Sequence, residues 1–184
     1  MNIIYLFKKY PPYLKAAVYG ANDGLVTTFA VVAGAAGAGL PVPSALILGI
    51  SNVVADGLSM GLGDFLGERS ERRIDSSTKN KIAVWHTGLI TFLFFVLAGL
   101  LPLISLVLVV LDIPILINLS DNYLLLSSVT TGFAMFAFGS LRTLVTKGSW
   151  IKNGMEMLLV GMLAAALAYG LGHFLQRLFS SFLL

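Results

Sequence analysis

The stretch VVADGLSMGLGDFLGERSE, residues 53–71, decides the fold class because it sets carboxylates into an apolar helix. Asp56, Asp64 and Glu68 all come before its first basic residue, Arg69. A carboxylate at the centre of a membrane-spanning helix costs roughly 2.5 to 3.5 kcal/mol on insertion scales. If this helix crosses a membrane, its charges need a function that compensates for that cost.

Apolar residues dominate the whole chain, which indicates a membrane protein. Hydrophobic residues make up 57% of the 184 residues, charged residues make up 11%, and the mean hydropathy is +0.89. A soluble domain carries about 25% charged residues. The length fits one domain over residues 1–184, and the lack of Cys excludes disulfides and thiolate metal sites. The net charge of +3 is interpreted as a membrane topology signal, so no nucleic-acid partner is expected.

Five apolar segments are each close to, or longer than, the roughly 20 residues that cross a bilayer. They cover residues 18–40, 43–67, 83–111, 123–141 and 154–175. The sequence therefore predicts an all-α, multi-pass integral membrane protein with five transmembrane helices in contact with the lipid bilayer. The membrane is expected to be the plasma membrane of a prokaryote or the membrane of a vacuole or other organelle.

Basic residues gather on one side of this predicted topology. All of the 12 Lys and Arg residues except Arg177 lie before the first helix, between the second and third, or between the fourth and fifth. Because positive charge is enriched in cytoplasmic loops, we expect the N-terminus in the cytoplasm and the C-terminus on the opposite side.

One face of the second predicted helix carries a row of potential metal ligands. At about 100° per residue, this face holds Asn52, Asp56, Met60, Asp64 and Glu68, which we call the polar track. Asp23 lies in the first helix, which runs antiparallel to the second, and it is expected at the depth of Met60 to Asp64. Neither apolar segment contains a basic residue that could pair with these acids, so they must bind protons, face water or bind a cation.

Met60 narrows the choice of cation. Mg²⁺ and Ca²⁺ prefer oxygen ligands alone, whereas a thioether favours a softer first-row ion such as Fe²⁺ or Mn²⁺. Two alternatives stay open. Met60 could serve only to fill the core, and Glu68 could pair with nearby arginines. Glu156 is expected to pair with Lys152, four residues earlier. No bound cofactor is expected, because the metal ion is the transported substrate.

The chain also resembles a known family. The segments YGANDGLVTTFAVVAGAAGAGL (residues 19–40) and ISNVVADGLSMGLGDFLGERSE (residues 50–71) resemble the first two helices of the vacuolar iron transporter family. The segment GSWIKNGMEMLLVGMLAAALAYGLG (residues 148–172) is similar to its last helix. The resemblance implies a five-helix homodimer that moves Fe²⁺, often with Mn²⁺, out of the cytosol against protons. It also implies that Asp23 and Met60 line the path.

The chain departs from that family in one place. Plant and yeast-like members insert a long Glu-rich helical segment after the second helix, which gathers metal in the cytosol. Here only a short loop separates the second and third helices, and Glu68, Glu71 and Asp75 are candidates for a reduced form of that segment.

These patterns together predict a transporter, not an enzyme, that exports Fe²⁺ or Mn²⁺ by proton antiport and works as a homodimer. The Gly-rich hairpin of the first two helices is expected to contact the second copy near Ala35 and Ala38. One alternative is a membrane-embedded, metal-dependent enzyme such as a phospholipid-head-group transferase, although DGLSMG lacks the Ala-Arg pair of that motif. Another is a non-transporting partner subunit, which leaves the carboxylates unexplained.

Overall fold

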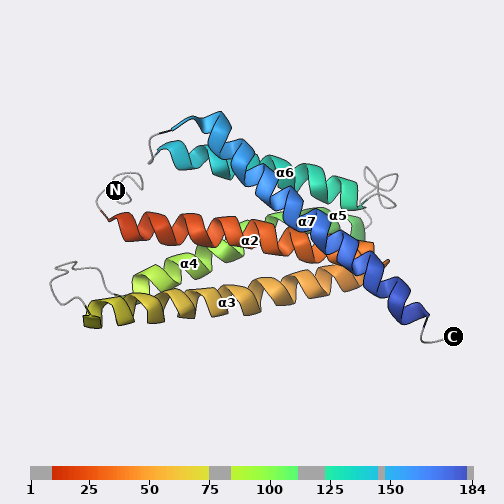
Figure 1. The fold of residues 1–184 in the computed structure, drawn as a ribbon, viewed down its shortest axis with the longest axis horizontal. Helices are drawn as coiled ribbons and strands as arrows, with labels where there is room; N and C mark the ends of the chain where they lie inside the picture. The colour runs from red at the N-terminus through yellow and green to blue at the C-terminus, as the bar shows by residue number, and fades with distance from the viewer. Residues whose placement is uncertain (1–9, 75–83, 112–122, 145–147, 182–184) are drawn as a thin grey trace.

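The computed structural model describes residues 10–74, 84–111, 123–144 and 148–181, and its regular elements in these ranges are all helical (Figure 1). Four helices are long and apolar enough to cross a membrane, and a bent helix pair makes a fifth span if it is counted as one. The predicted all-α, multi-pass architecture is confirmed. The helices are α2 (Pro11–Gly37), α3 (Val42–Ile74), α4 (Val84–Gly99), α5 (Leu101–Val110), α6 (Tyr123–Leu141), the 3₁₀ turn η2 (Arg142–Leu144) and α7 (Trp150–Ser180).

Several helices extend beyond the apolar segments that mark them in the sequence. α2 begins at Pro11, because proline suits the first turn of a helix, where its missing N–H is not needed. α3 continues through its arginines to Ile74, and its 33 residues span about 50 Å, more than the roughly 30 Å of a hydrocarbon core. α7 likewise exceeds the predicted segment at both ends. α3 and α7 are therefore longer than a hydrocarbon core is thick, and the arginines of α3 lie in its last two turns.

The predicted third helix, over residues 83–111, is divided into two helices, α4 and α5, which form one broken span if they are counted together. α4 and α5 meet at an angle of 41° around Leu100. Pro102 lies in the first turn of α5, where it has no N–H to donate to the preceding turn and its ring crowds the carbonyl four residues earlier. The apolar pattern continues through this bend, so hydropathy alone does not reveal it.

A tight hairpin joins α2 to α3. Gly39 takes a φ of +67°, a left-handed conformation that suits glycine. The Gly39 N–H donates to the carbonyl of Ala36, and the Leu40 N–H donates to the carbonyl of Ala35, which is the Schellman pattern of a helix C-terminus. α2 and α3 therefore run back along one another.

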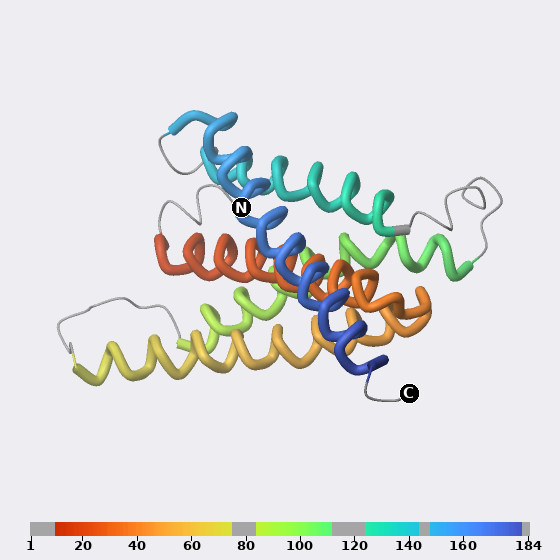
Figure 2. Tube along the Cα trace, turned by 45° about the vertical axis from the view of Figure 1, so that its right-hand side comes forward, coloured from red at the N-terminus to blue at the C-terminus, as the bar shows by residue number. Residues whose placement is uncertain are grey.

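α2 lies in the middle of the molecule, with α3 on one side and α6 and α7 on the other (Figures 1 and 2). Glycines let the helix backbones approach closely. A Cβ at Gly20 would collide with the Thr91 carbonyl of α4, and a Cβ at Gly37 would collide with the backbone of Tyr169 in α7. Ala35 is 5% exposed and packs with Val32 and Ala45 inside the chain, so the expectation that Ala35 contacts a second copy is wrong.

The described basic residues lie mainly at one end of the long axis. The start of α2, the end of α3, the start of α4, the end of α6 and the start of α7 all lie at the left of Figure 1. These helix ends carry Lys15, Arg69, Arg72, Arg73, Arg142 and Lys152, whereas Arg177 lies near the other end of the axis. The remaining lysines, and Asp75, lie outside the described residues. Which end faces the cytoplasm stays a prediction.

Candidate functional site

The polar track forms one edge of α3. Asn52, Asp56, Met60, Asp64 and Glu68 are all half-buried. The next row of the helix is fully buried and made of small residues, Ala45, Gly49, Val53, Gly57 and Gly61, which pack against α4 and α5. On the other side of the track, Ser59, Gly63 and Gly67 are exposed, and nothing lies within 4 Å of a Cβ built on either glycine. The track therefore follows the border between the packed and the open side of α3.

Asp23 meets this track at Asp56. Asp23 and Asp56 each lie about four turns from the α2–α3 hairpin, so the antiparallel helices bring them to the same depth. Both side chains are half-buried. The expectation that Asp23 lies at the depth of Met60 to Asp64 is therefore wrong by about one helical turn, because Asp23 lies at the depth of Asp56.

The acids of the site differ in their partners. Asp64 Oδ2 accepts a hydrogen bond of 2.9 Å from Thr91 Oγ1 of α4. Glu68 Oε1 pairs with Arg72 Nε at 3.0 Å within α3, as the pairing alternative for Glu68 anticipated. Over the described ranges, the carboxylates of Asp23 and Asp56 have neither a hydrogen bond nor an ion pair. These two acids are the uncompensated charges of the site.

The described residues of a single chain do not form a closed set of metal ligands. Among the described residues, no three His, Cys, Asp or Glu side chains converge in a way that could hold a metal. Asn52 Nδ2 is buried, and within this part of the chain it has no hydrogen-bond partner. A cation at Asp23 and Asp56 therefore needs further ligands, such as the Met60 thioether, the Asn52 carbonyl, water or a second copy of the chain.

The sequence does not predict the hydrogen bond that Thr91 donates to Asp64. Thr91 is fully buried in α4, and its hydroxyl reaches across to α3. The available signal was a lone pair of threonines, Thr87 and Thr91, one turn apart in an otherwise apolar helix. That signal does not name Asp64 as the partner, because the two residues are 27 positions apart.

Other polar residues lie away from the track. His86 Nδ1 lies 3.0 Å from the Tyr13 hydroxyl, and the His86 ring is 4.0 Å from that of Trp85 between centroids. Glu156 pairs with Arg142 at 3.2 Å. Within the described part of the chain, Arg142 is the ion-pair partner of Glu156, so the expected pairing of Glu156 with Lys152 is wrong. The contacts of Tyr13 with His86 and of Arg142 with Glu156 join different helical elements, and neither contact involves a residue of the track.

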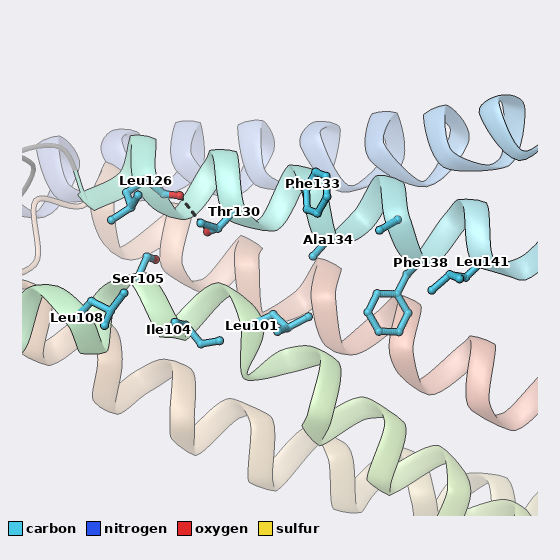
Figure 3. Close-up of a pocket in the computed structure, with 11 residues that line it drawn as sticks. Leu101, Ile104, Ser105, Leu108, Leu126, Thr130, Phe133, Ala134, Phe138 and Leu141 are labelled. Carbon is cyan, nitrogen blue, oxygen red and sulfur yellow. Dashed lines mark hydrogen bonds between the residues drawn. The ribbon is translucent and has the colours of Figure 1, made fainter. Parts of the chain in front are cut away.

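A cavity of about 410 Å³ lies between α5 and α6 (Figure 3). Its lining is apolar except for Ser105 and Thr130. Both hydroxyls donate to backbone carbonyls of their own helices, Ser105 to Pro102 and Thr130 to Leu126. The described lining of this cavity contains no charged side chain, and the polar track stays the candidate path for an ion.

Comparison with known proteins finds the same family over most of the chain. A family model described as the VIT family matches residues 14–83 and 72–173. Vacuolar iron transporter homolog 4 of Arabidopsis thaliana is 28% identical over 182 residues, which cover 89% of this chain and 84% of that protein. Vacuolar iron transporter homolog 2.1 of the same plant is 24% identical over 189 residues, which cover 89% of this chain and 81% of that protein.

A second kind of match is local. The vacuolar iron transporter of Toxoplasma gondii is 41% identical over 69 residues, which cover 38% of this chain and only 23% of that protein. The chain thus spans about a quarter of the Toxoplasma protein but more than four fifths of each of the two Arabidopsis proteins.

Proposed function

The chain belongs to the VIT family, and we propose that it transports Fe²⁺ or Mn²⁺ across the membrane, from the cytosol to the opposite side. The relatives that match most of the chain are named as homologues of iron transporters, which favours transport over the enzyme alternative. One observation carries the proposal: the antiparallel helices α2 and α3, both long and apolar enough to span a membrane, place the half-buried carboxylates of Asp23 and Asp56 at the same depth.

The energetics of these acids support a moving cation. Each carboxylate costs roughly 2.5 to 3.5 kcal/mol near the centre of a spanning helix. Two carboxylates at one depth also repel each other, and a divalent cation between them removes both penalties. Protons remove them as well, so the site is suited to hold either metal or protons.

Met60 supports a transition metal as the substrate. It lies on the track one turn from Asp56 and is half-buried. A mixed set of carboxylate and thioether ligands favours Fe²⁺ or Mn²⁺ over Mg²⁺ and Ca²⁺. Within its described residues, the single chain brings no three His, Cys, Asp or Glu side chains together around an ion, which favours a homodimer that brings two tracks together.

We propose that transport is proton antiport. A metal ion binds carboxylates only after they lose their protons. Metal that enters from the cytosolic end therefore releases protons, and protons from the other side displace the metal. The charge distribution along the long axis supports a cytoplasmic N-terminus, because the basic helix ends gather where α2 begins.

The first test is metal uptake by proteoliposomes that contain a metal-sensing dye. The unchanged protein should take up Fe²⁺ and Mn²⁺ but not Mg²⁺. Asp23→Asn and Asp56→Asn should each abolish uptake while the protein still inserts, because removal of an intramembrane charge favours insertion. Full uptake by both variants would show that the metal does not pass these carboxylates.

A further inference from the structure

We propose that Thr91 is a positioning residue, which holds the carboxylate of Asp64 in the orientation that binds the passing metal ion. This inference rests on the proposed function, because it treats Asp64 as a ligand. It adds α4 to a site that sequence and family resemblance confine to the first two membrane helices. Thr91 itself has no role as a ligand in this account and acts through Asp64.

The geometry is a single short bond between two helices. Thr91 is 0% exposed, and its Oγ1 donates to Asp64 Oδ2 at 2.9 Å. Threonine hydroxyls inside helices commonly donate to a carbonyl of the preceding turn, as Thr27 does to the Asp23 carbonyl in α2. Thr91 donates to a carboxylate of another helix instead, which fixes both side-chain rotamers.

Close backbone contacts hold Thr91 in place. A Cβ at Gly20 of α2 would collide with the Thr91 carbonyl, so α2 presses directly on this residue. Gly88 of α4 and Gly61 of α3 meet about one turn away, and a Cβ on Gly61 would lie 2.8 Å from the Gly88 carbonyl. The Thr91 hydroxyl is therefore fixed relative to α3 by packed backbone, and Asp64 cannot rotate away without losing its hydrogen bond.

The bond leaves Asp64 able to bind metal. A carboxylate has about four lone-pair sites, and Thr91 uses one of them. A hydroxyl carries no charge, so it orients the carboxylate without neutralising it as an arginine would. Glu68 shows that contrast, since Arg72 pairs with it one turn further along. Hydrogen bonds from outside the ligand shell typically contribute about 10- to 100-fold to metal affinity.

The test compares Thr91→Val with Thr91→Ser and a matched control. Valine keeps the shape of threonine and removes the hydroxyl, while serine keeps the hydroxyl. Thr131→Val in α6 is the control, because Thr131 is also 0% exposed and its hydroxyl has no partner among the described residues. Two quantities are measured for each protein. The first is the Mn²⁺ concentration that gives half of the maximal uptake rate into proteoliposomes. The second is the Mn²⁺ concentration that gives half of the maximal rise in melting temperature in detergent.

Thr91→Val should need about tenfold more Mn²⁺ in both measurements, with the maximal uptake rate retained. Thr91→Ser and Thr131→Val should match the unchanged protein. A purely structural role would instead lower the melting temperature without metal and leave the Mn²⁺ dependence unchanged, which would overturn the inference. If the unchanged protein binds Mn²⁺ but takes up neither Mn²⁺ nor Fe²⁺, the proposed function fails while the role of Thr91 is still decided by the melting measurement. If the unchanged protein binds Fe²⁺ but not Mn²⁺, the same two quantities are measured with Fe²⁺; if it binds neither ion, both proposals fail.

Discussion

The four acids along the proposed path differ in what holds each carboxylate. Arg72 pairs with Glu68 at the end of the path, Thr91 holds Asp64, and within the described residues Asp23 and Asp56 have no polar partner. The counter-charge thus decreases from the charged helix end towards the membrane interior. In our account, an ion first meets an arginine-paired acid, then an oriented acid, and finally two acids that only a cation or protons can neutralise.

We propose that Met60 sets the preference of the protein for one metal ion over another. Met60→Leu keeps the approximate volume and removes the sulfur, so folding should be little affected. We expect weaker Fe²⁺ uptake and a relative shift towards harder ions such as Mn²⁺. Competition between the two metals in proteoliposomes measures this shift. If the competition is unchanged, Met60 serves only to fill space between helices.

At the residue scale, periodicity predicts the polar track but not its partners. Five residues at a spacing of four share a face of any α-helix, and the structure places all five at one half-buried edge. The depth of Asp23 follows from the length of the α2–α3 hairpin, and it differs from the prediction because α2 ends at Gly37 and α3 begins at Val42. The hydrogen bond from Thr91 is a tertiary contact, which no local pattern encodes.

At the scale of the helix, α3 has two distinct sides. The small-residue row from Ala45 to Gly61 packs against α4 and α5 inside the chain. The opposite side carries Ser59, Gly63 and Gly67 in the open, next to the polar track. The open side of small residues suits close packing against a second copy, which would supply the ligands that one chain lacks.

A single cysteine tests this arrangement, because the chain has none of its own. We expect Ser59→Cys to form a disulfide-linked dimer on oxidation in the membrane, since the same face of each copy meets at a two-fold axis. Leu163→Cys in α7 is the matched control, because Leu163 is 64% exposed and lies on another helix. Gel mobility without reducing agent measures the dimer. Equal cross-linking at both positions, or a fully active monomer, would contradict the proposed interface.

The helices themselves are largely predictable, and their ends are less so. The bounds of α6 coincide with the predicted apolar segment over residues 123–141, because the apolar residues and the helix both end at Leu141. α3 continues to Ile74, past the end of its apolar segment, and Glu68 and Arg72 form an ion pair one turn apart within this extension. The bend at Leu100 depends on Pro102, and an apolar run hides it from a hydropathy pattern.

At the scale of the whole molecule, the proposed path follows the long axis from the basic end inward. The start of α2 and the end of α7 lie at opposite ends of that axis (Figure 1), which agrees with an odd number of spans when α4 and α5 count as one. The central claim is that the same carboxylates carry metal in one direction and protons in the other.

The most direct test reads two dyes on the same proteoliposomes, one for the metal and one for the pH of the lumen. Addition of Fe²⁺ or Mn²⁺ outside should raise the luminal metal and drive protons out of the lumen together, and an acidic lumen should speed up metal uptake, because protons displace the metal from the carboxylates. Asp56→Asn vesicles provide the control for leakage. Metal uptake that moves no protons and ignores the pH gradient would contradict antiport and make the protein a passive metal channel.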